Sequence, residues 1–278
     1  MLMEDNIELM DLEELNLKKK ILIKNILRIA VEGGSSAAHL GGALSSVDII
    51  TSLFFSIMNY DLNNFKNEKR DRFILSKGHA CLVLYSALLE KKIINWDQVS
   101  KFEQDNSDFP GHPVKNLDVG IEFSTGSLGM GIGLAIGVAL GLRKKKHDNK
   151  IFVLLGDGEC NEGSVWEGLM TINHHNLKNI TVIVDKNNFQ QTGKTQEIIT
   201  NSNLDEKFKS FGIDTQEVNG HSLEELNSVF LNSIKSDKPS AIIANTIKGH
   251  GVKLFENDNK WHHSILTKEL YEECLKDL

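Results

Sequence analysis

The stretch IFVLLGDG, residues 151–158, decides the fold. Its first five residues are all apolar, which is typical of a strand covered on both faces of a parallel sheet. Gly156, Asp157 and Gly158 follow directly. Glycines on both sides of a carboxylate allow a tight turn and a close approach to a bulky charged group. The stretch therefore predicts a buried strand that ends in a carboxylate suited to Mg²⁺ or Ca²⁺, although an ordinary β-turn has the same pattern.

Strand-like and helix-like segments alternate on both sides of this stretch. ITVIV, residues 180–184, is a second apolar run and ends at Asp185. Further strands are expected at 72–75, 213–218 and 241–246, and helices at 17–32, 45–58, 79–90, 126–142, 164–175 and 222–235. Ser222 and Glu225 form a capping-box pattern at the start of the last helix. The alternation predicts an α/β fold: a doubly wound, mostly parallel sheet with helices on both faces.

Length, charge and cysteine content narrow the class of protein. The 278 residues fit one large α/β domain or two small ones. A net charge of −7 argues against sequence-independent binding of nucleic acid. The three scattered cysteines exclude a disulfide framework and a CxxC zinc site, and they suit a reducing cytoplasm. Residues 1–14 are acidic, so we expect no secretory signal there.

One uncharged stretch, residues 123–142, has the length of a membrane span. Gly129, Gly133, Gly137 and Gly141 lie four residues apart, which resembles the dimer motif of membrane helices. However, the stretch begins with polar residues and leads into a strand pattern typical of soluble proteins. We therefore expect no membrane span but a buried helix, whose glycines admit close approach of another helix or, at its start, of a ligand.

A second polar group follows the next buried strand. Asn187, in the segment DKNN at 185–188, comes thirty residues after Asp157. Because the carboxyl ends of parallel strands meet at one edge of a sheet, we expect these two side chains to lie close together. Mg²⁺ takes few protein ligands and completes its octahedron with phosphate and water oxygens. The pair predicts a metal that bridges a diphosphate.

This pair resembles the diphosphate-binding signature of thiamine-diphosphate enzymes, in which Gly-Asp-Gly is followed about thirty residues later by Asn. Five further motifs occur in the order seen in transketolases: AHLGG (38–42), SKGHA (76–80), PGHP (110–113), TGSLGMG (125–131) and WH (261–262). The match covers about residues 25–263. Spaced motifs in a fixed order are specific, so the chain resembles the transketolase family over nearly its whole length.

The resemblance implies a cofactor site for thiamine diphosphate with Mg²⁺ (or Ca²⁺). The implied metal ligands are the side chains of Asp157 and Asn187 and the backbone carbonyl of Phe189. The implied cofactor-binding residues are His79, Gly126, Ser127, Leu128, Gly156, Asp157, Gly158, Glu159, Glu162, Asn187 and His262. In the family a glutamate at the position of Glu162 also buttresses the subunit contact. Its alternative role is that of an acid favoured at a helix N-terminus.

The resemblance also implies that four of the ten histidines are catalytic: His39, His79, His112 and His262. They are expected to converge on the diphosphate and the reacting carbon, where imidazoles hold phosphates, polarise a ketose carbonyl and transfer protons. The alternative for each is a hydrogen-bonded structural histidine. His250 is a candidate for the rim of the site, and surface or structural roles are expected for His147, His174, His175 and His221.

Two residues depart from the family pattern around His39. Ala38 replaces the usual glycine and Leu40 the usual proline. Because His39 itself is kept, we expect a shifted backbone with the histidine's role retained, or else an altered substrate pocket.

The resemblance covers only the first of the three domains of a full-length transketolase. We expect residues 1–278 to form one thiamine-diphosphate- and metal-binding domain, without the pyrimidine-binding and C-terminal domains. The missing parts imply a separate C-terminal subunit, an α₂β₂ assembly with self-association, and sites at the subunit interfaces. The expected activity is transfer of a two-carbon ketol unit from a ketose phosphate to an aldose.

Two alternatives stay open. One keeps the cofactor and changes the sugar, as in a branched-sugar transketolase or a 1-deoxyxylulose-5-phosphate synthase-like enzyme. The other is a non-catalytic assembly or regulatory subunit that retains the fold. A P-loop enzyme is disfavoured, because no GxxxxGK[ST] motif occurs.

Overall fold

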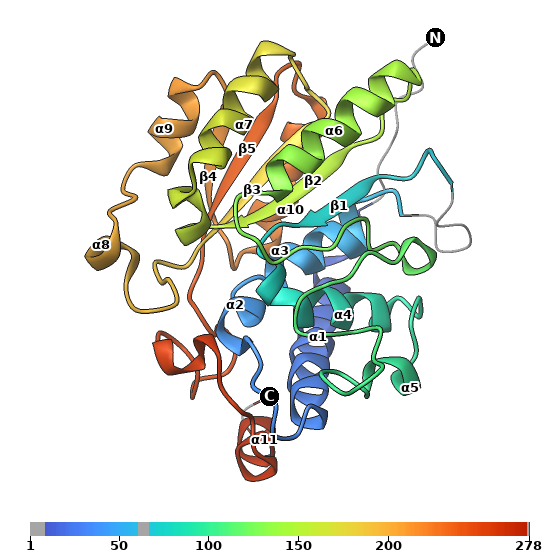
Figure 1. The fold of residues 1–278 in the computed structure, drawn as a ribbon, viewed down its shortest axis with the longest axis vertical. Coiled ribbons are helices and arrows are strands. Elements are labelled where there is room, and N and C mark those ends of the chain that lie inside the picture. The colour runs from blue at the N-terminus through green and yellow to red at the C-terminus, as the bar shows by residue number, and fades with distance from the viewer. Residues whose placement is uncertain (1–8, 61–66, 277) are drawn as a thin grey trace.

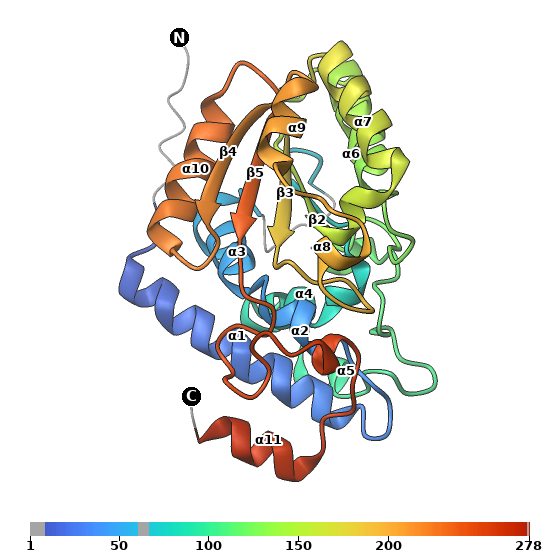
Figure 2. The same ribbon diagram turned by 90° about the vertical axis from the view of Figure 1, so that its left-hand side faces the viewer.

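The computed structural model of the chain describes residues 9–60, 67–276 and 278. Within these residues, five parallel strands form one sheet with helices on both faces (Figures 1 and 2). The strands are β1 (Arg72–Leu75), β2 (Ile151–Gly156), β3 (Ile180–Lys186), β4 (Asp214–Asn219) and β5 (Ser240–Asn245), in the spatial order β1-β2-β3-β5-β4. The predicted α/β fold with a parallel sheet is therefore confirmed.

The strand register brings the predicted polar strand ends together. Gly156 of β2 lies opposite Asp185 of β3, and Asp185 lies opposite Ala244 of β5. The backbone N–H of Asp157 donates to the carbonyl of Asp185 over 3.2 Å. The segments after β2, β3 and β5 therefore leave the sheet at one common edge, where ligands bind in doubly wound sheets.

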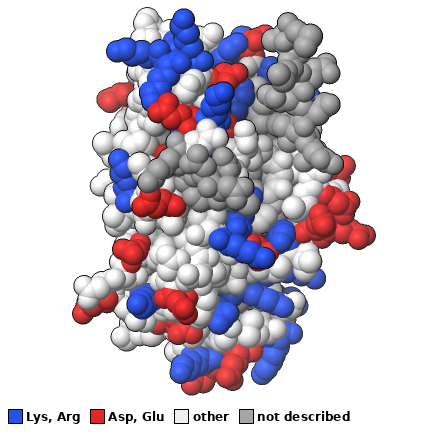
Figure 3. All heavy atoms as spheres, turned by 90° about the vertical axis from the view of Figure 1, so that its right-hand side faces the viewer, with Lys and Arg blue, Asp and Glu red and all other residues white. Residues whose placement is uncertain are grey.

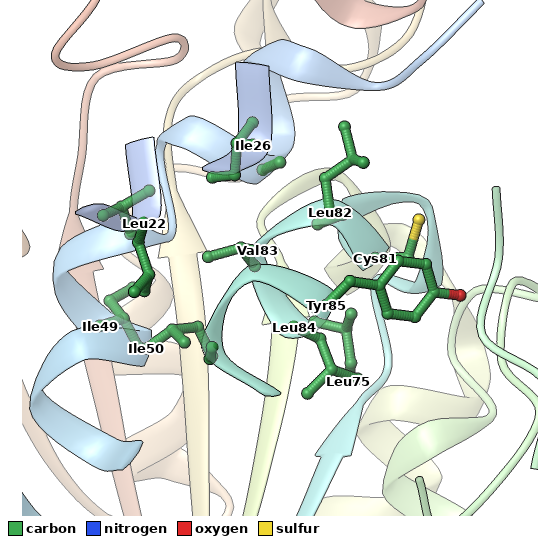
Figure 4. Close-up of a cluster of buried hydrophobic side chains, with 14 of the residues drawn as sticks. Leu22, Ile26, Ile49, Ile50, Leu75, Cys81, Leu82, Val83, Leu84 and Tyr85 are labelled. Carbon is green, nitrogen blue, oxygen red and sulfur yellow. The ribbon is translucent and has the colours of Figure 1, made fainter. Parts of the chain in front are cut away.

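One face of the sheet carries the larger core (Figure 4). Leu22 and Ile26 pack with Ile49, Leu82 and Leu75 in this buried cluster. The longer helices that contribute to it include α1 (Leu12–Glu32), α3 (Val47–Ser52), α4 (Cys81–Glu90) and α10 (Leu223–Lys235). The helix α4 follows β1 and the helix α10 follows β4. The packing of these two helices therefore fixes where the segments just after β1 and β4 lie.

The other face is covered by α6, α7 and α9. Successive residues of β2 alternate between the two cores: Phe152 and Leu154 face the first, and Val153 and Leu155 face the second. This is why a wholly apolar strand is needed. The second layer consists of α6 (Gly131–Lys144), α7 (Gly163–His174) and α9 (Leu204–Ser210). Four short helices complete the described fold: α2 (Leu40–Leu44), α5 (Trp96–Val99), α8 (Thr195–Ile198) and α11 (Lys268–Leu275).

Two predicted helices differ in their limits. The helix expected at 45–58 is the short helix α3, followed directly by a π-helical turn at Leu53–Ile57; a separate helix, α2, ends just before it at Leu44. The helix expected at 126–142 begins only at Gly131, because Gly126 and Gly129 have positive φ angles of 145° and 80°. Such angles are incompatible with a right-handed helix. Residues 126–130 instead form a loop at the edge of the sheet.

The helix α6 was expected to be buried, and in the chain on its own this holds for one of its faces only. Gly133, Gly137 and Gly141 face solvent, and a Cβ atom added at any of them would meet nothing within 4 Å. No helix among the described residues has both the length and the apolarity to cross a membrane. We expected no secretory signal in residues 1–14. Residues 1–8 of this segment lie outside the described residues.

Half of the predicted capping box is present at α10. The Ser222 hydroxyl accepts from the backbone N–H of Glu225 over 3.2 Å. The Glu225 carboxylate, however, accepts from the N–H of Asn219, at the end of β4, rather than from Ser222. The helix start is thereby tied to the strand before it.

Acidic and basic side chains are intermixed on the face shown in Figure 3. Proteins that bind nucleic acid without sequence preference present a clustered basic surface instead. The expectation that nucleic acid is not a partner, which was based on the net charge of −7, stays a prediction.

Candidate functional site

The four predicted catalytic histidines come together from four separate segments. His39 directly precedes α2, His79 lies in the turn after β1, His112 lies in the loop after α5, and His262 lies in the turn Asn259–His262. The His39 ring centroid lies 5.4 Å from that of His79, 5.5 Å from His112 and 5.4 Å from His262. The expected convergence is therefore present in the structure, while the catalytic role of each ring stays a prediction.

Loss of hydration favours the neutral form of three of these imidazoles, those of His39, His79 and His262. Loss of hydration, helped by the neighbouring His263, lowers the pKa of His39 to about 3. Loss of hydration and the charge of Lys248 lower the pKa of His262 to about 4. The pKa of His79 is lowered well below its ordinary value, by burial first and by Lys77 second. A neutral ring offers one N–H donor and one acceptor nitrogen, so each of these three rings can donate one hydrogen bond to a ligand and accept another.

A short backbone bridge brings His39 next to the segment around Ser264. The N–H of Ala38 donates to the carbonyl of Ser264 over 2.9 Å, and the N–H of Ser264 donates back over 3.1 Å. This bridge places His263 against His39, with ring centroids 4.3 Å apart. His263 is not among the site residues that the sequence motifs predicted. The two departures from the family pattern, Ala38 and Leu40, are both buried.

The predicted metal ligands lie at the ends of β2 and β3. One carboxylate oxygen of Asp157 accepts from the N–H of Asn188 over 2.8 Å and from the Thr195 hydroxyl over 3.1 Å. The amide oxygen of Asn187 accepts from the N–H of Phe189 over 3.1 Å. These contacts hold both groups at the edge of the sheet, beside the loop that carries the Phe189 carbonyl.

The charge and the hydrogen bonds at this edge fit a metal and a diphosphate. Burial, and then the nearby charge of Asp185, raise the pKa of Asp157 to about 6, as expected for a carboxylate that awaits a cation. Among the described residues, the buried amide nitrogen of Gln190 has no hydrogen-bond partner. Gln190 lies against Gly158, where an added Cβ would come within 2.8 Å of its Cγ atom. An unpartnered donor beside a glycine suits an anion.

Glu159 acts on the protein's own loops. Its buried carboxylate accepts from the Ser76 hydroxyl, from the N–H of Gly129 over 2.8 Å and from the N–H of Gly156 over 3.1 Å. Three segments of the site are thereby joined to one side chain. A direct contact of Glu159 with a cofactor stays a prediction.

The predicted aminopyrimidine segment, Gly126 to Leu128, lies next to His112. A Cβ at Gly126 would come within 3.0 Å of the His112 ring, and one at Gly78 would come within 2.7 Å of the Gly126 nitrogen. Ser127 and Leu128 are exposed. Glu162 is exposed as well and directly precedes α7, but its side chain makes no capping hydrogen bond.

Two buried lysines belong to the site and were not predicted. Lys77 pairs with Asp185, and its Nζ atom also donates to the Gly42 carbonyl over 3.0 Å. Lys248 contacts Nδ1 of His262 over 3.0 Å, and burial followed by the charge of Lys77 lowers the pKa of Lys248 to about 8. Both lysines come one to three residues after a buried strand, which is the signal that could have identified them.

His250, the candidate for the rim of the site, packs on His221. Its ring stacks on that of His221 with centroids 3.6 Å apart, and its Nδ1 atom is 3.1 Å from Glu256. The structural role expected for His221 agrees with this position, because both of its ring nitrogens are hydrogen-bonded to the protein.

Comparison with protein families and known proteins identifies the class. Residues 19–276 match the family model described as the transketolase, thiamine diphosphate binding domain. The chain is 35% identical over 266 residues to an apulose-4-phosphate transketolase subunit of Actinobacillus succinogenes, covering 96% of both chains. It is 32% identical to a 6-deoxy-6-sulfo-D-fructose transketolase subunit of Clostridium sp., covering 95% of this chain and 94% of that one.

The fold is also similar to that of solved transketolases. The transketolase of Campylobacter jejuni superposes with a TM-score of 0.89 at 29% identity, and 96% of this chain matches 43% of that longer chain. The chain thus spans less than half of a full-length transketolase. On the family match, the relatives of matching length and the shared fold together, this chain belongs to the transketolase family, in which it corresponds to the thiamine diphosphate binding domain.

Proposed function

We propose that this chain is the thiamine-diphosphate-binding subunit of a split transketolase. With a separate C-terminal subunit it would transfer a two-carbon ketol unit from a ketose phosphate to an aldose. The observation that carries the proposal is the convergence of four histidines in a chain that matches a named transketolase subunit over 96% of that subunit's length. Residues 1–278 would form one domain and leave the pyrimidine-binding and C-terminal domains to the partner.

The edge of the sheet supports a metal and diphosphate site. Asp157, Asn187 and the carbonyl of Phe189 would hold Mg²⁺ (or Ca²⁺), whose charge would offset the buried carboxylate. The diphosphate would accept hydrogen bonds from the backbone at Gly158 and from the amide nitrogen of Gln190. Thiamine diphosphate, when bound, supplies the nucleophilic carbon and stores the electron pair during ketol transfer.

The histidines would orient the sugar and hold protons. The pKa values of His39, His79 and His262 lie below their ordinary value, so each ring would present one N–H to a sugar hydroxyl or carbonyl oxygen and one nitrogen that accepts a hydrogen bond. His112 is exposed beside Gly126 and can meet a ligand from the open side. Lys248 contacts His262 and keeps a positive charge close to that ring.

The partner subunit is inferred from the exposed parts of the same layer. Gly133, Gly137 and Gly141 leave one edge of α6 free for a close approach. Leu128 is exposed just before this helix, and Glu162 is exposed beside Gly129, where an added Cβ would lie 2.7 Å from the Glu162 Cβ atom. Self-association and a C-terminal subunit would together give an α₂β₂ assembly. We expect the complex to work in the cytoplasm, because the three free cysteines are all buried and none is paired.

The sugar is a second question. Curated relatives of matching length are named as transketolase subunits for apulose-4-phosphate and for 6-deoxy-6-sulfo-D-fructose. These names favour a specialised sugar over a general ketose phosphate. A branched-sugar phosphate is therefore the second candidate donor, and Ala38 and Leu40 beside His39 are the places to look for its selection.

Reconstitution tests the proposal. The chain would be co-expressed with the product of the neighbouring gene and assayed for ketol transfer with xylulose 5-phosphate, apulose 4-phosphate and 6-deoxy-6-sulfofructose as donors. Activity only in the complex supports a split enzyme, and activity of this chain alone contradicts it. Calorimetry with thiamine diphosphate and Mg²⁺ distinguishes the assembly-subunit alternative, because a complex that binds no cofactor is not this enzyme.

A further inference from the structure

A second cluster of ionisable side chains lies outside the four-histidine site. His221, in the turn between β4 and α10, has its Nδ1 atom 2.9 Å from Oδ2 of Asp48 in α3. The other oxygen of Asp48 lies 2.7 Å from Nζ of Lys19 in α1. Asp48 is 0% exposed, so its charge is shielded from water and depends on these two partners. The three side chains connect two helices of one layer to the turn after β4.

The second nitrogen of His221 binds the backbone. Nε2 accepts a hydrogen bond from the N–H of Ile247 over 2.8 Å. Because a nitrogen that accepts carries no proton, the ring proton lies on Nδ1 and is donated to Asp48. The Asp48 carboxylate therefore selects the tautomer of His221, as carboxylates do behind imidazoles that must keep one orientation.

Ile247 directly precedes Lys248 in the segment after β5. The hydroxyl of Thr246 donates to Asp185 on one side of Ile247, and on the other side the N–H of Gly249 donates to the Gly41 carbonyl over 3.0 Å. The Ile247 side chain is 36% exposed, so its main chain is the part that His221 holds. His221 is thus the hydrogen-bond acceptor for the backbone N–H of Ile247, the residue between Thr246 and Lys248.

Lys248 depends on the direction in which it leaves this segment. Its side chain packs against Gly41, where an added Cβ would come within 3.1 Å of the Lys248 Cε atom. From there Nζ donates to Asn259 over 2.6 Å and contacts Nδ1 of His262 over 3.0 Å. A rotation of the peptide between Thr246 and Ile247 would change the direction in which the Lys248 side chain leaves the backbone and would move Nζ away from His262.

We infer that His221, held in one tautomer by Asp48, is a positioning residue. It directs the Lys248 side chain toward His262 and toward the edge of the sheet where the diphosphate would bind. The inference rests on the proposed function, because Lys248 acts on a ligand only if the site binds thiamine diphosphate. His221 itself touches no reacting group. It acts through the amide of Ile247.

The same cluster has the composition of a metal site, and its hydrogen bonds argue against one. Ligand atoms of Asp48, His221 and His250 lie within 4.8 Å of one another. A cation on Nδ1 of His221 would move the ring proton to Nε2, where it would point at the N–H of Ile247. Metal binding at Nδ1 of His221 and the hydrogen bond from Ile247 to Nε2 therefore exclude each other. Binding of Zn²⁺ at His221 is one outcome that the test below can detect.

The tautomer is measured first, without any cofactor. Nitrogen-15 NMR of labelled histidine side chains, with His221→Gln used for assignment, should show His221 as a neutral ring protonated on Nδ1. Addition of Zn²⁺ should leave this signal unchanged. A ring protonated on Nε2, or Zn²⁺ bound at His221, would overturn the inference.

The second measurement uses the assembled complex with Mg²⁺ and follows thiamine diphosphate affinity by calorimetry. His221→Leu should weaken binding by about tenfold or more, the usual loss when a group that orients a functional side chain is removed. His221→Gln should restore most of it, because the amide oxygen can accept from Ile247. His175→Leu, on an exposed histidine, is the matched control.

A double-mutant cycle separates positioning from general damage. If His221 acts through Lys248, then Lys248→Met should weaken binding to a similar degree, and the double variant should be no weaker than Lys248→Met alone. Additive losses, or a His221→Gln variant as weak as His221→Leu, would contradict the inference. If the wild-type complex binds no thiamine diphosphate, the proposed function fails instead, and the tautomer measurement still decides whether Asp48 and His221 hold Ile247.

Discussion

Lys77 and Asp185 form an ion pair beneath the site in which neither side chain is more than 1% exposed. Burial alone would raise the pKa of Asp185, but the charge of Lys77 and the hydrogen bonds from Ser45 and Thr246 hold it below its ordinary value. The pair joins the ends of β1 and β3. It supplies the charge balance at the edge where a diphosphate would bind.

Removal of one partner should be costly. Lys77→Met leaves the Asp185 carboxylate buried without its cation, so we expect the free energy of unfolding to fall by about 3–5 kcal/mol, measured by urea denaturation. Adding Asp185→Asn should recover part of this loss, because the amide keeps an acceptor without the charge. A double variant less stable than Lys77→Met would show that the pairing is not the source of the effect.

The Asp157 carboxylate should make metal binding depend on pH. Its pKa of about 6 lies above the ordinary value, so protons compete with Mg²⁺ as the pH falls through 6. We expect Mg²⁺-dependent binding of thiamine diphosphate to be constant above pH 7 and to weaken below 6, by calorimetry. Asp157→Asn should lower Mg²⁺ affinity by more than about 100-fold, since even a group behind a metal ligand contributes about 10–100-fold. Asp237→Asn, at a 96% exposed carboxylate, is the control.

The buried histidines should make the chain sensitive to acid. The pKa of His39, about 3, lies below its unfolded value of about 6.5, so the unfolded chain takes up a proton first as the pH falls. The stability that the neutral ring permits is complete above 6.5 and is lost toward 3. We therefore expect His39→Asn to reduce the loss of stability between pH 6.5 and 4 in cofactor-free protein, measured by thermal unfolding. An unchanged slope would count against a neutral buried ring.

Two glycines should respond oppositely to alanine. At Gly78 a Cβ would lie 2.7 Å from backbone atoms of Thr125 and Gly126, so Gly78→Ala should destabilise the chain by about 1–3 kcal/mol and weaken cofactor binding. Gly133 has nothing within 4 Å and lies in α6, so Gly133→Ala should stabilise the isolated chain by about 0.5–1 kcal/mol. Chemical denaturation of both variants measures the contrast, and equal effects would contradict it.

The exposed edge of α6 should matter for assembly. A Cβ atom at Gly137 would have nothing within 4 Å, so Gly137→Leu should leave the thermal stability of the isolated chain unchanged or raise it. If another chain packs on this edge, the added side chain should block it and shift the complex to smaller species. Analytical ultracentrifugation of the complex distinguishes these outcomes. An assembly that tolerates Gly137→Leu would place the subunit contact elsewhere.

Sequence patterns predicted the layers of this fold well, and the local backbone less well. The apolar runs at 151–155 and 180–184 are strands buried on both faces, where a continuous pattern has few alternatives. The helix starting at 126 was wrong because glycine leaves the helix and the positive-φ loop equally open. A pattern of apolar residues indicates which side chains are buried. It does not predict the backbone conformation of glycine, which has no side chain.

The candidate site shows the same division. Motif order brought His39, His79, His112 and His262 to one place, which no periodicity could have done. Lys248 was missed because a lysine after a strand usually reaches into solvent, and only the packing against Gly41 turns it inward. The roles of Glu159 and His221 depend on backbone amides from distant segments, and such partners leave no signature in the spacing of residues.

The three bonds to Glu159 have a consequence for how such a protein can diverge. Because one carboxylate ties the loops after β1, before α6 and at the end of β2 together, a substitution in any one of them strains the other two. These loops can therefore change only in concert, and drift at single positions is suppressed there. A new sugar preference would arise more readily at residues that Glu159 does not hold, such as Ala38 and Leu40, where the chain already departs from the sequence pattern of its family.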